Sequence, residues 1–78
     1  MNNKLLLVED SKETFQMVNQ ATSSLGELTW AKSLEEANKE LADKSFDLII
    51  LDIGLPDGSG FELCSSIQAK TPETPIFI

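Results

Sequence analysis

Short runs of consecutive apolar residues alternate along the chain with longer stretches in which apolar residues recur at helical spacing. The uninterrupted runs lie at residues 5–8 (LLLV), 48–51 (LIIL) and 76–78 (IFI). Runs this short and this rich in branched side chains are typical of strands that are buried on both faces of a parallel sheet. Residues 27–31 instead alternate, with Leu28 and Trp30 on one side, and this pattern predicts an exposed edge strand.

The stretch after the first run predicts a helix. Asp10 and Ser11 both offer N-cap oxygens, and Glu13 follows Asp10 at the spacing of a capping box. Gly26 is expected to close this helix. Its apolar stripe is expected to consist of Met17, Val18, Ala21 and Leu25.

Two further helices are predicted on the same grounds. Ser33 and Glu36 form a clearer capping box, and the helix that they open is expected to end near Lys44, before Phe46 begins the central strand. A third helix is expected from about Ser59. The apolar stripes are Leu34, Ala37, Leu41 and Ala42 in the second helix, and Phe61, Cys64 and Ile67, with Leu63 beside them, in the third.

This alternation of strands and helices predicts an α/β fold made of parallel βαβ units with right-handed crossovers. A chain of 78 residues has room for one small domain, and no linker, repeat or change of composition divides it. Its first apolar run is too short for a signal-peptide core or a membrane span.

The charge and the cysteine content of the chain argue against several classes of function. The chain has 13 acidic and 6 basic residues and a net charge of −7, which argues against nucleic-acid binding by this segment and favours cations or basic partners. Cys64 is the single cysteine, and there is no histidine, so an internal disulfide and a thiolate–imidazole zinc site are both excluded. We therefore expect a cytoplasmic protein, with Cys64 as a structural thiol on its helical stripe.

Acidic side chains directly follow two of the predicted buried strands. Glu9 and Asp10 follow the first run, and Asp52 follows the run at 48–51. If these strands are neighbours, three carboxylates converge at one crevice, and a bound cation would relieve their repulsion. Oxygen ligands without histidine or cysteine favour a hard ion such as Mg²⁺. A carboxylate beside Mg²⁺ can act as a nucleophile towards a phosphoryl group.

Three segments together resemble the receiver domain of two-component response regulators. They are LLLVEDS at 5–11, FDLIILDIGLPDGSGFEL at 46–63 and TPETPIFI at 71–78. The resemblance implies a flavodoxin-like, receiver-type three-layer αβα sandwich. Its parallel sheet would have strand order 2-1-3-4, the family's fifth strand being absent.

The resemblance also implies roles for particular residues. Asp52 matches the phosphoacceptor, and Glu9 and Asp10 match the acidic pair that holds Mg²⁺. Gly54 matches the position whose backbone carbonyl also binds the metal. The positions that match the family's loop after the third strand are Pro56, Gly58 and Gly60.

The match covers residues 1–78 as the N-terminal two-thirds of a typical receiver domain of roughly 120 residues. The family's Ser or Thr after the fourth strand, and its Lys and aromatic residue on the fifth, would lie beyond Ile78. We therefore expect a partial receiver domain, and a homodimer formed through the exposed edge of the fourth strand.

The expected function is that of a phosphoacceptor. Asp52 would take a phosphoryl group from a sensor histidine kinase or a phosphotransfer protein, and the chain would not be an enzyme beyond self-phosphorylation and autodephosphorylation. A phosphohydrolase is one rival, but such enzymes usually need a second acid two residues on, where this chain has Gly54. A receiver-like interaction module that never accepts phosphate is the other.

Each of these residues also has a purely structural interpretation. Asp10 could serve only as a helix N-cap, and Glu9 could be a plain surface acid. The loop glycines could serve backbone conformations with positive φ, Gly58 above all. Trp30 and the phenylalanine residues are expected in the core.

Overall fold

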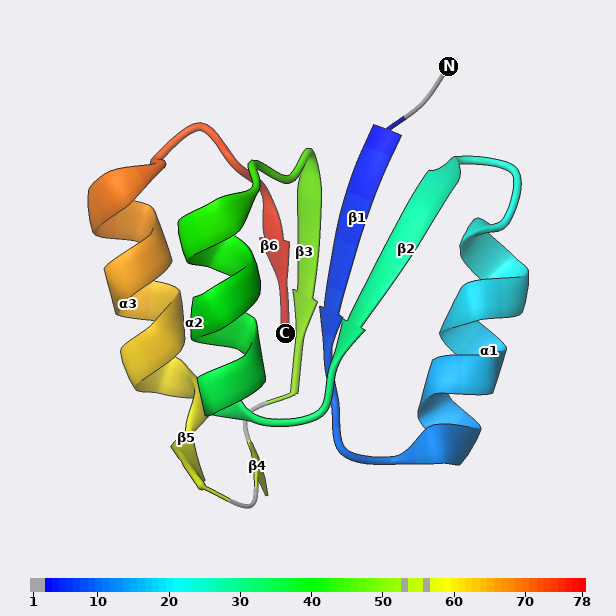
Figure 1. The fold of residues 1–78 in the computed structure, drawn as a ribbon, viewed down its shortest axis with the longest axis horizontal. Coiled ribbons are helices and arrows are strands. Elements are labelled where there is room, and N and C mark those ends of the chain that lie inside the picture. The colour runs from blue at the N-terminus through cyan, green and yellow to red at the C-terminus, as the bar shows by residue number, and fades with distance from the viewer. Residues whose placement is uncertain (1–2, 53, 56) are drawn as a thin grey trace.

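A four-stranded parallel sheet forms the middle layer of the molecule, in the order β2-β1-β3-β6 (Figure 1). The structure is a computed structural model, and it describes residues 3–52, 54–55 and 57–78. The strands of this sheet are β1 Asn3–Val8, β2 Gly26–Ala31, β3 Leu48–Leu51 and β6 Ile76–Phe77. The helices are α1 Lys12–Thr22, α2 Leu34–Asp43 and α3 Gly60–Lys70.

The helices lie on both faces of the sheet, with α1 on one side and α2 and α3 on the other (Figure 1). The predicted α/β class, layer arrangement and strand order are confirmed, β6 being the fourth strand of the sheet along the chain. None of the helices in the described part of the chain is long and apolar enough to cross a bilayer.

The central strand β1 is buried on both faces, as predicted. All four residues from Leu5 to Val8 are buried, because β1 lies in the middle of the sheet, between β2 and β3, and helices lie on both faces of the sheet (Figure 1). For β3 the prediction is half wrong. Ile49 and Leu51 are each 1% exposed, but Leu48 and Ile50 on the opposite face are only half-buried. The reason is that α1 packs against β2 and leaves β3 less covered on that face.

The core lies between the sheet and helices α2 and α3. Its buried members are Leu6, Val8, Ala31, Ala37, Phe46, Ile49, Leu51, Leu55, Leu63 and Ile67. Leu34, Leu41 and Cys64 pack against this core, so two of the stripe predictions hold for most of their residues. Ala42 and Phe61 are the exceptions: Ala42 is exposed, and Phe61 is 59% exposed while its neighbours Leu63 and Ile67 point inward.

The predicted stripe of α1 is wrong in register. Met17 is 69% exposed and Leu25 is 47% exposed, whereas Thr22 is buried and Phe15 is half-buried. Phe15 faces the sheet because its ring stacks on the ring of Trp30, and the two ring centroids lie 4.2 Å apart. Of the predicted stripe, only Val18 shares the inward face with these residues.

The ends of α1 also differ from the prediction. Ser11 is its N-cap, since the Ser11 hydroxyl accepts a hydrogen bond from the Thr14 N–H at 3.3 Å, so Asp10 does not cap the helix. The helix ends at Thr22 rather than at Gly26, which begins β2. It can end early because the Leu25 N–H donates to the Thr22 carbonyl at 2.9 Å and forms a turn.

A short antiparallel hairpin, which the sequence did not predict, connects β3 to α3. Its strands are β4 Gly54–Leu55 and β5 Gly58–Ser59. Gly58 has a φ of 150°, which confirms that this position needs the freedom of glycine. Gly60 is buried at the start of α3, behind the N-cap Ser59. Pro56, which matches the family's loop, lies outside the described residues.

Candidate functional site

The site is built where β1 and β3 end side by side. The two strands pair in register, Val8 opposite Leu51, and the Asp52 N–H donates to the Val8 carbonyl at 2.9 Å. Each strand is therefore followed by its acid at the same end of the sheet, the end where the strands have their carboxyl termini. The adjacency on which the prediction depended is present in the structure.

Three carboxylates converge at this edge. Oxygens of Glu9, Asp10 and Asp52 all lie within 4.8 Å of one another. Glu9 and Asp52 are half-buried and Asp10 is exposed, so the group opens to solvent on one side. Gly54 lies in β4, two residues after Asp52.

The backbone of Glu9 is held by the edge strand β2. Its N–H donates to the Ala31 carbonyl at 3.0 Å, and its carbonyl accepts from the Trp30 indole Nε1–H at 2.7 Å. The Glu9 carboxylate in turn accepts from the Ser11 N–H at 3.1 Å. Hydrogen bonds therefore orient both the backbone and the carboxylate of Glu9.

Trp30 is the site residue that sequence reasoning missed, since it was expected in the core. It is half-buried, with Phe15 stacked on its ring and the Lys32 ammonium 4.7 Å from its centroid. Its position opposite Leu7 at the end of β2 puts the indole within reach of Glu9. Only knowledge of the strand order could have indicated this contact.

Electrostatics at the site raise the pKa of the Glu9 carboxyl. Partial burial is the main cause, and the Ser11 N–H opposes it by stabilising the charged form. The charge of Asp52, a hydrogen bond with its side chain, and the charge of Asp10 raise the pKa further. The site therefore favours a positive charge or a proton.

A shallow cavity of about 280 Å³ adjoins two of the acids. It is lined by Leu7, Glu9, Ile50, Leu51, Asp52 and Ile78. It lies where β3 is only half covered, so a group that approaches Asp52 from this face meets apolar walls and two carboxylates.

The donor set suits Mg²⁺. All three side chains offer oxygen, and ligands on opposite sides of an octahedral Mg²⁺ ion lie about 4.2 Å apart, close to the observed spread of 4.8 Å. The three carboxylates could therefore hold the ion either directly or through water molecules that the ion retains.

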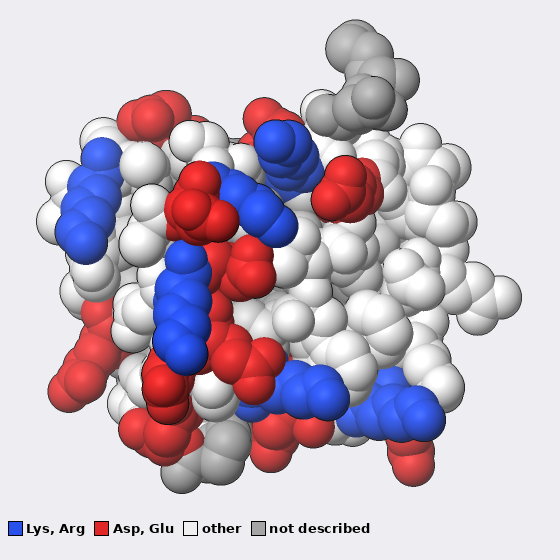
Figure 2. Space-filling model, viewed as in Figure 1, with Lys and Arg blue, Asp and Glu red and all other residues white. Residues whose placement is uncertain are grey.

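The remaining charges are distributed unevenly over the surface. Figure 2 shows acidic and basic side chains interleaved over α2, where Glu35 pairs with Lys39 and Glu40 with Lys44. The surface over α1 is mostly uncharged in the same view, and residues 14–26 contain no charged side chain. On this face the charged side chains therefore lie mainly away from α1.

An open parallel sheet with acids beyond the carboxyl ends of two neighbouring strands defines a doubly wound α/β protein with its ligand site at that edge. The chain belongs to the response regulator receiver domain family, whose sequence pattern matches residues 5–78.

Relatives and solved structures agree with this assignment. The response regulator PilR of Pseudomonas aeruginosa is 35% identical over 77 residues, covering 94% of this chain and 17% of PilR. The crystal structure of DrrB, an OmpR/PhoB homologue from Thermotoga maritima, matches with a TM-score of 0.90 at 30% identity, over 97% of this chain and 34% of DrrB. The response regulator TrrA from Thermotoga maritima, solved in complex with Mg²⁺-BeF, matches with a TM-score of 0.86 at 31% identity, over 97% of this chain and 66% of TrrA. The chain thus spans about a third or less of the length of PilR and DrrB.

Proposed function

We propose that this chain accepts a phosphoryl group on Asp52 in a Mg²⁺-dependent reaction, with a sensor histidine kinase or a phosphotransfer protein as the donor. The observation that carries the proposal is the convergence of Glu9, Asp10 and Asp52 within 4.8 Å at the ends of β1 and β3. TrrA, solved with Mg²⁺-BeF, supports it by family relationship.

Each acid has a role in the proposed reaction. Glu9 and Asp10 would hold Mg²⁺ together with Asp52 and the Gly54 backbone carbonyl. When bound, Mg²⁺ would neutralise carboxylate and phosphoryl oxygens that otherwise repel each other. The backbone hydrogen bonds of Glu9 and Asp52 keep these ligands in place.

The chemical step joins an Asp52 carboxylate oxygen to phosphorus. With a phosphohistidine donor the P–N bond breaks, its electron pair passes to the imidazole nitrogen, and that nitrogen gains a proton. The product is an aspartyl phosphate, which water later hydrolyses. The cavity beside Asp52 gives the incoming group an approach from the half-covered face of β3.

We do not assign the chain a catalytic turnover of its own beyond self-phosphorylation from small donors and autodephosphorylation. Gly54 stands where a phosphohydrolase would carry its second acid. The proposed setting is the cytoplasm, where a kinase can reach the site. A second copy of the chain is proposed as a further partner, through the edge of β6 that pairs with no strand in the described part of the chain.

The test is intact mass spectrometry after incubation with a small phosphodonor and Mg²⁺. The wild type should gain one phosphoryl group, and Asp52→Asn should gain none. Asp43→Asn is the matched control, because it makes the same change in charge at an exposed position at the end of α2 and should be phosphorylated normally. Equal adducts on wild type and Asp52→Asn would overturn the assignment of Asp52.

No adduct on any variant would favour the second candidate, a receiver-like interaction module that works without phosphorylation. The half-covered face of β3 and the exposed Phe77 favour this alternative, because they offer apolar surface to a protein partner. Capture of a histidine kinase by wild type and Asp52→Asn with equal affinity would support it.

A further inference from the structure

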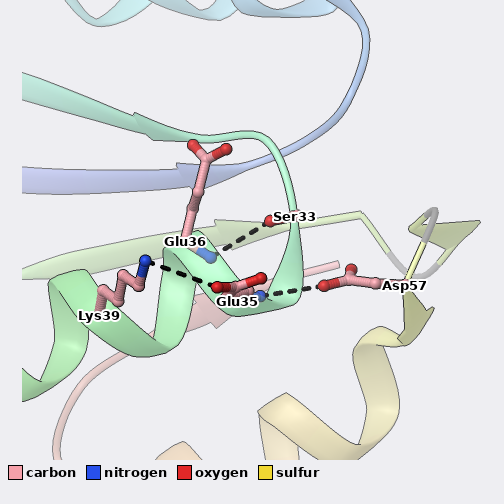
Figure 3. Close-up of polar contacts among 5 residues, drawn as sticks. All are labelled: Ser33, Glu35, Glu36, Lys39 and Asp57. Carbon is pink, nitrogen blue, oxygen red and sulfur yellow. Dashed lines mark hydrogen bonds and ion pairs between the residues drawn. The ribbon is translucent and has the colours of Figure 1, made fainter.

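One helix of this molecule is capped by a residue from a distant segment. The Asp57 carboxylate accepts hydrogen bonds from the first two N–H groups of α2, at 2.8 Å from Leu34 and at 3.1 Å from Glu35. Figure 3 shows the Asp57 side chain reaching from the β4–β5 hairpin to the first turn of this helix. The contact joins residues 23 positions apart in the chain.

The cap completes the hydrogen bonding of the helix end. The Glu36 N–H donates to the N-cap Ser33 hydroxyl at 3.2 Å, and the Ala37 N–H makes the first regular helical bond, to the Ser33 carbonyl at 3.0 Å. The Leu34 and Glu35 N–H groups, which no helical carbonyl can reach, are those that Asp57 binds. A negative charge at this end also interacts favourably with the helix dipole.

Two further acids, Glu35 and Glu36, lie in the first turn of α2, and the Glu36 carboxylate accepts a hydrogen bond from the Lys32 N–H at 3.2 Å. Glu35 lies in the same turn, but its carboxylate pairs with Lys39 one turn further on, at 3.5 Å (Figure 3). The N–H groups of Leu34 and Glu35 lower the pKa of Asp57, as hydrogen bonds to a charged carboxylate do.

Two apolar contacts hold the hairpin on the same helix end. Leu55 is buried in the core against which the Leu34 side chain packs. Gly58 lies so close to Leu34 that a Cβ added there would come within 2.8 Å of the Leu34 Cδ1 atom. Because Leu55 pairs with Gly58 across the hairpin, and Asp57 precedes Gly58, these contacts act on one short segment.

This segment also carries part of the proposed site. Gly54 begins β4, two residues after Asp52, and pairs with Ser59 across the hairpin. A hairpin pinned at Asp57 therefore limits where the Gly54 carbonyl can lie relative to the acids on β1 and β3.

We infer that Asp57 is a positioning residue, which docks the β4–β5 hairpin on the N-terminus of α2 and thereby sets the place of the Gly54 carbonyl at the metal site. This inference rests on the proposed function for its effect on Mg²⁺. The docking itself does not depend on that function.

The test compares Asp57→Ala with Ser33→Ala. Each variant removes a cap of the first turn of α2, but only Asp57 belongs to the hairpin, so Ser33→Ala is the matched control for lost helix capping. Mg²⁺ affinity is measured by titration calorimetry, and the rate of phosphorylation by intact mass with a small phosphodonor. Asp57→Ala should lower both about tenfold, as loss of a group that orients a metal ligand does, whereas Ser33→Ala should change them less than about twofold.

Asp57→Asn supplies a second check, because its amide oxygen keeps one acceptor for the Leu34 N–H. Its affinity for Mg²⁺ should lie between those of the wild type and Asp57→Ala. Equal effects of Asp57→Ala and Ser33→Ala on Mg²⁺ affinity would overturn the inference, since general weakening of α2 would then explain both.

A wild type that binds no Mg²⁺ and gains no phosphate would overturn the proposed function instead. In that case, amide hydrogen exchange in the hairpin tests whether Asp57 docks the hairpin on α2. Faster exchange of the Gly58 and Ser59 amides in Asp57→Ala, but not in Ser33→Ala, would support it, and equal exchange would refute it.

Discussion

Partial burial, and then the nearby charge of Asp52, raise the pKa of the Glu9 carboxyl. Like charges held within 4.8 Å at a partly buried edge lower the stability of the folded state when no cation is present. The same closeness is what gives the group affinity for a divalent cation. The residues are thus arranged for binding at some expense of stability.

Replacing Asp52 by Asn should stabilise the cation-free protein. Removing one charge relieves repulsion on the order of 1 kcal/mol in water-like surroundings. Urea unfolding in chelator measures the gain, with Asp43→Asn as a control that should show little change. Adding Mg²⁺ should reverse the order, because the wild type, with all three carboxylates, then gains more binding energy in the folded state than the variant does. A variant less stable than the wild type in chelator would contradict this prediction.

The Asp57 cap should depend on pH. The pKa of this carboxyl is lowered in the folded state, so its contribution to stability is present above its ordinary value of 3.8 and is lost as the pH falls through the folded-state pKa. The difference in unfolding free energy between wild type and Asp57→Asn should therefore be constant from pH 7 to about pH 5 and shrink below about pH 4. Urea titrations across this range would measure it. A difference that grows in acid would contradict the cap.

At the scale of elements, β2 supports the site although it carries none of the acids. Its carbonyl at Ala31 and its indole at Trp30 both bond to the backbone of Glu9. The edge strand thus fixes the end of β1, and α1 contributes through the stacking of Phe15 on Trp30.

Trp30→Phe should isolate the hydrogen bond from the stacking. Phe keeps an aromatic ring for Phe15 but leaves the Glu9 carbonyl without its donor, which should cost about 1–2 kcal/mol. Phe15→Leu is the complementary control, since it removes the stacking and retains the indole bond. Thermal unfolding followed by circular dichroism would compare them. No loss of stability in Trp30→Phe would show that water replaces the indole.

The sequence predicted most elements because local signals mark them. Apolar runs marked three strands of the sheet, alternation marked β2, and Ser33 marked the start of α2. The three acids could be named from their places after the runs. Their adjacency could not, because a run does not indicate which strand lies beside it, and the family resemblance supplied that order.

The wrong and missing predictions concern features that local sequence patterns do not show. The stripe of α1 is set by Phe15 meeting Trp30, a contact between residues 15 positions apart in the chain, and not by the apolar spacing of Met17 and Ala21. The hairpin was missed because strands of two residues leave no periodic pattern. Asp57 and Trp30 act on partners in other elements, which no local pattern shows.

On the scale of the whole molecule, the two faces of the sheet are covered unequally. Helices α2 and α3 bury one face, while on the other α1 packs against β2 and leaves Ile50 half-buried. Strand β6 pairs with β3 on one side and has no other partner among the strands that the structure describes. Apolar surface and an unpaired strand edge thus coincide.

We expect the chain to self-associate through this edge at micromolar concentrations. Phe77→Lys should shift the protein towards monomer in sedimentation velocity, because Phe77 is 65% exposed on β6. Met17→Lys is the matched control, since Met17 is 69% exposed on α1, away from the edge, and the change should have no effect. A wild type that sediments as a compact monomer at every concentration would contradict the expectation.

The cap on α2 also orders events during synthesis of the chain. A ribosome completes α2 before it adds the hairpin, so the helix first emerges with the Ser33 cap but without Asp57. Its first two N–H groups acquire their final acceptor only after Asp57 has been made and the hairpin has folded back. The first turn of α2 should therefore fray in nascent chains that end before Asp57 and become protected once the hairpin docks, which links the maturation of this helix to completion of the segment that follows Asp52.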